Sequence, residues 1–544
     1  MTKIFNFDEF KGAGMKTNGV KNLSKVIFPF ALLISNSIYS KSYQNKNLNE
    51  FLNEFHKNPA QVMDRPPYKE ESANGSDAYV VIPNSADLSK DFLTVKDQYR
   101  NKVCKIKNGT EICAGELQGR AGIENNDVVE ELVDLGAKAL KNLYKMDQLK
   151  LQTARLSKKP WSDDYWPLYK GVLAFRYGDQ NKVTGEDWKE YTDYVYQNPS
   201  SSYIGEGFDG IEFLSPAEKY DLLVGDKDET LTKRMLSEGR PYYDRTGKVE
   251  TWMGICHGWA QAAYMLDRPS HKVNVLAADG QTVIPFFPSD IKALGSLLWA
   301  NVNVYTNFSG GRCNVKDPEK DEVGRVIDQK CFDTNPGTWH RAVVNQIGLS
   351  DRSVIIDATY DYEVWNQPVY SYSYLYFNPE TYETSKNFSD VAVDVNDFKK
   401  DKFKKYRHEN TKKVVGVEMV LEYIAETQPV QSEEDGEAFD YVKTVFYRYD
   451  LELDNSGNIL GGEWYSNMHP DFLWTPRKGD RALTRLDRNI EDAINEGQKQ
   501  HLWKKGDSIP LSWRKYIPPF SKEGQPLGLI VEGLIERSRD QAKL

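Results

Sequence analysis

Chain length sets the first limit on the architecture. A single hydrophobic core stops growing at about 250 to 300 residues, and this chain has 544. Hydrophobic residues make up 40% of the sequence, which is typical of water-soluble globular proteins. We therefore expect two or more structural units, each with a substantial core of its own.

An apolar segment near the start is typical of an export signal. The segment Val26 to Ile34 is too short to span a bilayer, follows several lysines and precedes small polar residues. We predict a signal peptide over residues 1–40, with translation starting at Met15; the alternative is a buried N-terminal helix. The mature protein should then be secreted, outside the cell or in a periplasm, with no membrane anchor.

The cysteine count is consistent with two disulfides in an oxidising compartment and one free thiol. The sequence has 5 cysteines. We expect disulfides between Cys104 and Cys113 and between Cys313 and Cys331, chosen for their proximity in sequence. Neither pair has the CxxC spacing of a zinc site. Cys256 remains unpaired and becomes a candidate for chemistry.

The charge balance excludes one class of partner. The chain carries 70 Lys and Arg against 80 Asp and Glu, a net charge of -10. Nucleic acids require a basic surface, so we expect no nucleic-acid partner. Proteins that present lysine side chains fit this charge better.

The pattern of the chain indicates helices first and strands later. The polar region 41–126 holds a hairpin signal, Asn108-Gly109, and could be an N-terminal region or a propeptide. Helical spacing recurs over residues 127–156, and Ser215 with Glu218 forms a capping box that opens another helix. Beyond Lys413 the sequence predicts strands, namely Val417 to Ala425 and Tyr441 to Leu453, with a turn at Asp454 to Gly457. We divide the remainder into a catalytic domain, 127–390, and a β-rich C-terminal domain, 391–544.

Cys256 falls at the start of a predicted helix. In TWMGICHGWAQAAYMLD, apolar residues follow it at helical spacing. The free N–H groups and the positive dipole end of a first helical turn stabilise a thiolate and can receive an oxyanion. We therefore predict Cys256 as a nucleophile. The alternative is a buried cysteine that packs as a small hydrophobe.

A thiolate nucleophile calls for a base, and His340 is our choice among 7 histidines. His340 opens HRAVVNQI, which we expect to be a strand, and SVIIDATYDY should return as the second strand of a hairpin. One position of the turn places Asp357 opposite His340, and a slightly later turn places Asp361 there. We predict that Asp357 orients His340, with Asp361 as the alternative acid.

Tryptophans flank the predicted nucleophile and base. Trp252 and Trp259 lie close to Cys256 in sequence, and Trp339 precedes His340. Aromatic walls there would exclude water and favour transfer to an amine, with a role near the oxyanion. The alternative is that these side chains only pack in the core.

Several motifs, taken together, match segments of a known family. GICHGWA is similar to the G-x-C-W-x-x-A nucleophile segment of the transglutaminase-like superfamily, although His257 stands where that pattern has Trp. Asp357-Ala358-Thr359 resembles its D-x-T acid motif, and VWNQPV from Val364 resembles the start of the peptide carried by oomycete cell-wall transglutaminases. PWSDDYWP and SPAEKYDLLVGD also look like that group. Over roughly residues 127–379 the chain thus resembles the transglutaminase elicitor family.

The resemblance implies a fold, a triad and a metal. The fold is α+β with a papain-like core, in which a helix bearing Cys256 packs on an antiparallel sheet bearing His340 and Asp357. Family members are described as calcium-dependent, but we find no EF-hand pattern, only acidic loops at Asp317 to Glu322 and Asp454 to Gly457. The sequence itself requires no cofactor, and a calcium site is not located.

The implied function is protein-glutamine γ-glutamyl transfer. Cys256 would form a thioester with a glutamine side chain, and a lysine amine would resolve it into an isopeptide cross-link. The partners would be proteins with accessible glutamine and lysine. The alternatives are a cysteine protease or glutamine deamidase with the same triad, and a secreted binding or elicitor protein without activity.

Overall fold

The computed structural model describes residues 48–71, 105–107, 110–112, 127–313, 315, 317–328, 331–359 and 363–541. The expected signal peptide lies outside the described residues, and so do Cys104, Cys113 and Asp361. Within the region 41–126, β2 (Lys105–Lys107) pairs antiparallel with β3 (Thr110–Ile112), one strand on each side of the predicted turn.

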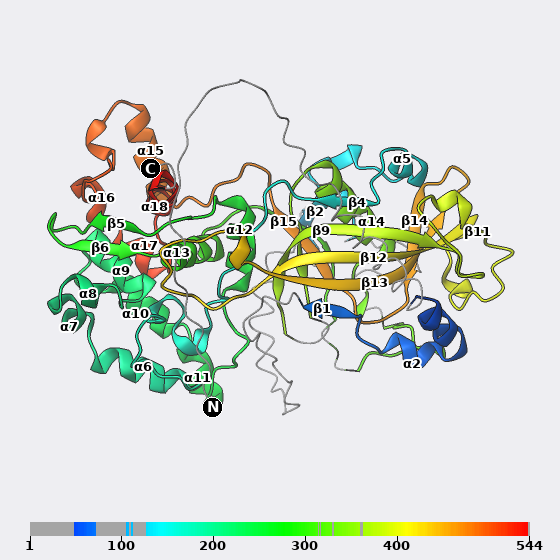
Figure 1. Ribbon diagram of the computed structural model, residues 1–544, viewed down its shortest axis with the longest axis horizontal. Coiled ribbons are helices and arrows are strands. Elements are labelled where there is room, and N and C mark those ends of the chain that lie inside the picture. Colours follow the sequence, from blue (N-terminus) through cyan, green and yellow to red (C-terminus); the bar gives the residue numbers. More distant parts are fainter. Residues whose placement is uncertain are drawn as a thin grey trace, which may run out of the picture. The chain divides into compact units, whose positions relative to one another are not determined.

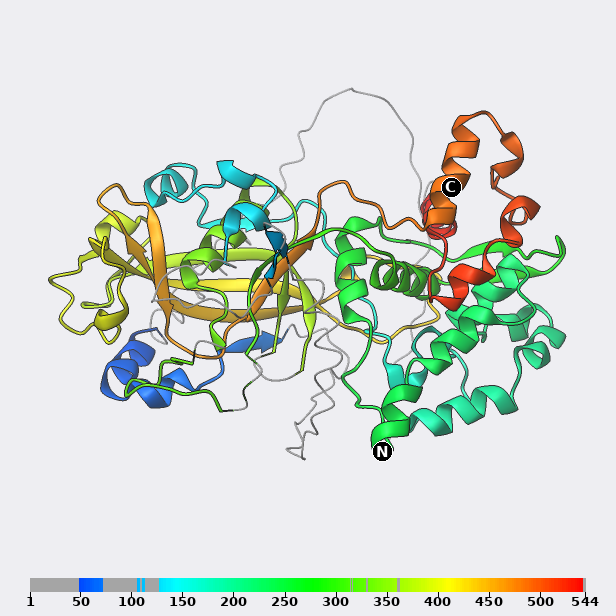
Figure 2. The same ribbon diagram turned by 180° about the vertical axis from the view of Figure 1, so that it is seen from behind.

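Three long antiparallel strands form the centre of the main sheet. β9 (Asn366–Phe377), β12 (Lys413–Ala425) and β13 (Tyr441–Leu453) lie side by side with β12 in the middle (Figure 1), and the view from behind agrees (Figure 2). In β9 the buried Tyr372, Tyr374 and Tyr376 alternate with more exposed residues, the period expected of a strand with one face on a core. The strands predicted beyond Lys413 are confirmed.

Shorter strands extend this sheet toward the segment that holds Asp357. β8 (Ile355–Asp357) pairs with β9, β15 (Phe472–Pro476) pairs with β8, and β7 (Thr306–Gly310) pairs with β15. The remaining strands of the sheet are β1 (Lys69–Glu71), β4 (Thr153–Arg155), β10 (Thr384–Ser385), β11 (Val393–Asp394) and β14 (Ile459–Trp464). Segments on both sides of the expected boundary at 390/391 therefore build one sheet.

The turn between β13 and β14 forms where the sequence predicts it. The Asp454 carboxylate accepts hydrogen bonds from the backbone N–H groups of Ser456 and Asn458, at 2.8 and 2.9 Å. Gly457 has a φ of 78°, a conformation that favours glycine. Aspartate and glycine thus stabilise this turn for the two reasons that make them common in turns.

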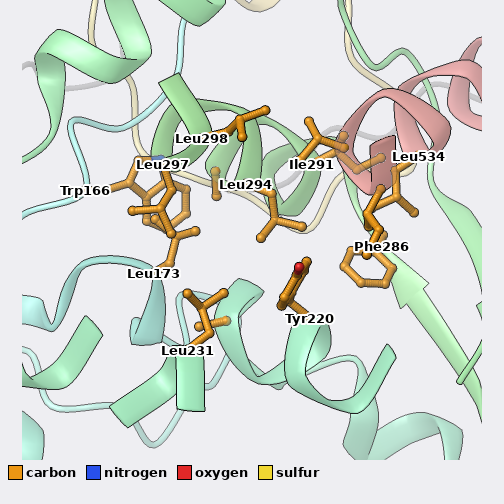
Figure 3. Close-up of a cluster of buried hydrophobic side chains, with 14 of the residues drawn as sticks. Trp166, Leu173, Tyr220, Leu231, Phe286, Ile291, Leu294, Leu297, Leu298 and Leu534 are labelled. Carbon is orange, nitrogen blue, oxygen red and sulfur yellow. The ribbon is translucent and has the colours of Figure 1, made fainter. Parts of the chain in front are cut away.

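A buried helix organises the helical core. Every side chain of α13 (Pro288–Asn301) from Pro288 to Ala300 is buried, as expected for a helix with neighbours on all sides. Figure 3 shows its Ile291, Leu294, Leu297 and Leu298 facing side chains of other elements, among them Trp166, Leu173, Tyr220, Leu231, Phe286 and Leu534.

α12 (Cys256–Met265) packs directly against α13. An added Cβ at Gly258 would lie 2.2 Å from the backbone oxygen of Ser296. Only glycine allows the two helices this close approach. This contact fixes the start of α12, where Cys256 lies.

The other helices are short. α9 (Pro216–Val224) has the predicted capping box between Ser215 and Glu218. Residues 127–156 form two short helices followed by β4, so helical spacing predicted the helices but not the strand. The other α-helices before Cys256 are α2 (Pro59–Met63), α4 (Val129–Leu132), α5 (Leu143–Gln148), α6 (Trp188–Gln197), α7 (Ser200–Gly205), α8 (Phe208–Ile211), α10 (Thr230–Ser237) and α11 (Arg240–Thr246). A two-stranded sheet joins β5 (Val273–Leu276) to β6 (Val283–Phe286).

The end of the chain is helical rather than β-rich. After β15 come α15 (Arg485–Asn495), α16 (Leu511–Arg514), α17 (Pro518–Lys522) and α18 (Gly528–Gln541). Thr484 caps α15 through a capping box with Asp487. The expectation of a β-rich extension over 391–544 is therefore wrong for this last part, while the α+β class is confirmed as mixed helices and antiparallel sheet.

His340 lies on a helix, and the predicted hairpin is wrong. α14 (Pro336–Val343) begins with Asn335, whose side chain caps it, and with Pro336 in its first turn, both of which favour a helix start. A π-helical segment (Val344–Leu349) follows. Trp339, Ala342 and Val343 recur at helical spacing and pack in the core beneath the sheet. The β-branched residues in this run suggested a strand, but the cap and the helical period decide the local structure.

The two predictions about the described cysteines are confirmed. Cys313 and Cys331 form a disulfide, and Cys256 is a free, buried thiol. Within the described residues, no helix has the length and apolarity needed to cross a membrane.

A buried ion pair joins α9 to α13. Lys219 Nζ lies 2.6 Å from Asp290 Oδ2, and both side chains are 0% exposed. The Tyr177 hydroxyl donates to the other oxygen of the same carboxylate at 2.8 Å. Burial lowers the pKa of Lys219 and raises the pKa of Asp290, and their attraction opposes both shifts.

Lys219→Met should lower the free energy of unfolding by about 3 to 5 kcal/mol, because the Asp290 carboxylate would stay buried without its cation. Lys189→Met is the matched control, since it breaks a pair with Asp193 whose side chains are 54% and 48% exposed, and it should change little. Urea denaturation measures both. Equal losses in the two variants would contradict the prediction.

Candidate functional site

Cys256 is the first residue of α12 and is 6% exposed. The preceding turn is held by a hydrogen bond from the Ile255 N–H to the Tyr165 carbonyl, at 2.8 Å. Tyr165 belongs to the buried segment PWSDDYWP, which explains why this motif matters to the site. The predicted position of Cys256, at a helix start, is confirmed.

The sulfur has two hydrogen-bond partners on β9 and the residues before it. The thiol donates to the Val364 carbonyl oxygen at 3.5 Å, and the Asn366 side-chain amide donates to the sulfur at 3.6 Å. Asn366 is fully buried, and its Oδ1 accepts from Trp474 Nε1 at 2.9 Å. The VWNQPV motif therefore lies against the Cys256 thiol, a contact that sequence reasoning missed.

Asp357 lies beside this contact. It ends β8 and pairs across the strands with Asn366. Its Oδ1 accepts from Trp365 N at 3.0 Å, Thr359 N at 3.2 Å and Thr359 Oγ1 at 2.9 Å. Thr359 of the D-x-T motif thus holds the carboxylate. Burial raises the pKa of Asp357 to about 6, opposed by the charge of Arg312 and by these hydrogen bonds.

A second carboxyl, Glu426, was not anticipated. It follows the end of β12 and accepts a hydrogen bond from Gln367 Nε2. Tyr423 of β12 faces Val369 of β9, and the same register continued places Glu426 beside Asn366, on the side away from Asp357. Burial raises the pKa of Glu426 to about 7. Only the long-range pairing of β9 with β12 identifies this residue.

The thiol is protonated at neutral pH. Burial raises the pKa of Cys256 to about 11; hydrogen bonds from Asn366 oppose this rise, and the charges of Glu426 and Asp357 add to it. Burial therefore works against the thiolate that the start of a helix favours.

The structure does not bring His340 to Cys256. His340 is fully buried, its Nδ1 lies 2.9 Å from the Tyr449 hydroxyl, and its ring packs 4.8 Å from that of Tyr374. Tyr374 and Asn366 belong to the same strand, β9, and at about 3.3 Å per residue they lie roughly 26 Å apart. The predicted facing pair of His340 and Asp357 is therefore wrong. Burial lowers the pKa of His340 to about 3.

The predicted tryptophans have different surroundings. Trp339 packs against Tyr447 and Trp464 in the core around His340, away from Cys256. Trp259 is fully buried, with its Nε1 donating to the Trp161 carbonyl at 3.1 Å. Trp252 is 9% exposed, and its Nε1 donates to Glu250 at 3.3 Å.

Two other tryptophans lie next to residues that contact the thiol. Trp365 falls between the two residues that contact the sulfur, and its ring lies 5.1 Å from that of Tyr165. The Trp474 Nε1–H donates a hydrogen bond to the side-chain oxygen of Asn366. Trp252 and Trp259 were chosen because they are close to Cys256 in sequence. The fold instead brings Trp365 and Trp474 from distant segments to the residues that contact the thiol.

In each of the two acidic loops considered for calcium, one aspartate accepts hydrogen bonds from the protein itself. Asp321 accepts from the backbone N–H groups of Val323 and Arg325 and from the Tyr406 hydroxyl. Asp454 stabilises its own turn. Across the described residues, no three His, Cys, Asp or Glu side chains cluster in a way that could hold a metal ion. Calcium dependence stays a prediction.

Comparisons with known proteins agree with the motifs. The family model described as Transglutaminase elicitor matches residues 135–487. The crystal structure of the GP42 transglutaminase from Phytophthora sojae is similar at 21% identity and a TM-score of 0.46, covering 74% of this chain and 99% of that one. Among curated proteins, none matches. Because the family match spans more than half of the chain and includes Cys256, Asp357 and Asn366, the chain belongs to the transglutaminase elicitor family.

Proposed function

We propose that this protein is a secreted protein-glutamine γ-glutamyltransferase with Cys256 as its nucleophile. The observation that carries the proposal is the free thiol at the start of α12, in contact with Asn366, whose cross-strand neighbour is the buried Asp357. This helix on sheet is the papain-like arrangement that we infer for the site. The family match supports the reaction class.

Asp357 acts as the base in this proposal, in place of His340. With a pKa of about 6, its carboxylate is ionised at neutral pH, when the thiol is not. A base with a pKa near the working pH is the most effective one. All three of its hydrogen bonds go to Oδ1, so within the described residues Oδ2 is the oxygen that can take the proton.

The proposed reaction has two halves. Cys256 Sγ attacks the carboxamide carbon of glutamine while its proton passes to Asp357, and that proton then leaves with the amide nitrogen as ammonia. The backbone N–H groups at the start of α12 stabilise the negative oxygen in between. A lysine amine next attacks the thioester, the C–S bond breaks, and an amine proton returns through Asp357 to the sulfur.

The charge around the thiol suits an amine as the second substrate. Asp357 and Glu426 both act on the sulfur electrostatically. A negative pocket attracts the lysine ammonium and can remove its extra proton before attack. The ring pair of Trp365 and Tyr165 would exclude water, which otherwise takes the acyl group as in a deamidase.

The described disulfide supports secretion. The Cys313–Cys331 bond is of a kind that persists in oxidising compartments and is rare in the cytosol. We therefore propose that the protein works outside the cytoplasm.

Incubation with a fluorescent primary amine and a glutamine-rich protein should label that protein, and Cys256→Ala should abolish the labelling because no thioester can form. In-gel fluorescence measures incorporation. Peptide fragments instead would indicate a protease, ammonia without incorporation a deamidase, and none of these a binding or elicitor protein. Labelling that persists in Cys256→Ala would refute the mechanism.

Asp357→Asn should lower kcat by about 100-fold or more, because the amide cannot accept the thiol proton. His340→Gln is the matched control, since it alters an equally buried polar residue that lies remote from the sulfur. It should keep kcat within about threefold per folded molecule. Steady-state amine incorporation, corrected for folded fraction by circular dichroism, tests both. A kcat lost in His340→Gln alone would restore the histidine as base.

The pH dependence follows from Asp357. As pH falls through about 6, its carboxylate becomes protonated and can no longer act as base, so kcat/KM should drop about tenfold per pH unit below that point. Rates of amine incorporation between pH 4.5 and 8, approximately, measure this. A profile that is flat down to about pH 4.5 would exclude Asp357 as the base.

A further inference from the structure

The Asn366 amide is held in one orientation. Trp474 Nε1 is a donor only, so the oxygen of Asn366 must face it, at 2.9 Å. The amide nitrogen then faces Cys256 Sγ, at 3.6 Å. The hydrogen-bond network thus decides which end of the amide meets the sulfur.

Trp474 is itself firmly placed. It lies on β15, between Ile355 of β8 and Phe308 of β7 in the strand register. Its ring is 6% exposed and packs with Ala260, one turn along α12 from Cys256. The tryptophan therefore fixes the amide relative to the helix that carries the thiol.

The two partners of the sulfur favour opposite protonation states. The Val364 carbonyl accepts from the thiol, so it stabilises the protonated form. Asn366 donates, so it stabilises the thiolate. Among the described residues, Asn366 supplies the side-chain donor on this sulfur, while Asp357 and Glu426 both disfavour a negative charge there.

We propose that Asn366 is a catalytic residue that stabilises the Cys256 thiolate as the proton leaves, and that Trp474 is the positioning residue that aims its amide. This deepens the proposed function and rests on Cys256 as the nucleophile. The role differs from that of Asp357, which takes the proton but cannot stabilise the charge left behind. The sequence alone identified neither Asn366 nor Trp474 as a site residue.

The test is the rate of Cys256 alkylation by iodoacetamide in the full-length protein, from pH 7 to 10 approximately. Asn366→Leu has nearly the same volume and adds no charge, so it removes the side-chain donor without placing another negative group beside the sulfur. Its rate should fall about tenfold at each pH, equivalent to one unit of thiol pKa. Trp474→Phe keeps the donor but frees the amide to rotate, so its rate should fall about threefold.

Asn345→Leu is the matched control, because Asn345 is an equally buried asparagine whose side-chain amide donates to the Leu140 and Arg341 carbonyls. It should leave the alkylation rate and its pH profile unchanged. A folded Asn366→Leu that reacts at the wild-type rate would overturn the inference. If that variant does not fold, a wild-type rate in Trp474→Phe overturns it instead.

Alkylation reports on the thiol and needs no substrate, so the two proposals can fail separately. Slowed alkylation in a protein that incorporates no amine would support the donor role and refute the transferase. Unchanged alkylation in a protein that does incorporate amine would refute the donor role alone.

Discussion

The antiparallel pairing of β8 with β9 is the interaction on which the site depends. It sets Asp357 opposite Asn366, and Asn366 meets the sulfur of Cys256. Because facing residues of an antiparallel pair lie about 5 Å apart, one register brings the carboxylate and the amide to the same place. A slip of β8 by one residue would turn Asp357 to the other face of the sheet and away from Asn366.

The other half of the site is positioned by α12, which is held from two sides. Gly258 allows contact with α13, and Ala260 packs with Ile355, Phe472 and Trp474 of the sheet. Cys256 thus lies where the helical core meets the sheet. The strand β15, from late in the chain, supports Asn366 directly, so the C-terminal segment completes the site rather than forming a separate accessory.

The sequence correctly predicted those features that depend on residues close together in the chain. The helix start at Cys256, the capping box at Ser215 and the long strands after Lys413 were all readable from spacing and caps. His340 was misassigned because β-branched residues masked a helix that Asn335 and Pro336 begin. Asn366, Trp474 and Glu426 could not be found, since only long-range strand pairing and packing bring them to the thiol, and one sequence carries no record of those pairings.

In the proposed mechanism, the protonation states of Cys256 and Asp357 explain how the site stays unreactive before a substrate binds. At neutral pH the thiol holds its proton and Asp357 does not, since their pKa values lie near 11 and 6. In the proposed reaction the thiolate therefore forms only as its proton passes to Asp357. A standing thiolate would react with oxidants and other electrophiles outside the cell. Burial, which opposes the charge, would thereby protect the proposed nucleophile. The side-chain amide of Asn366 would offset part of that opposition as the charge develops.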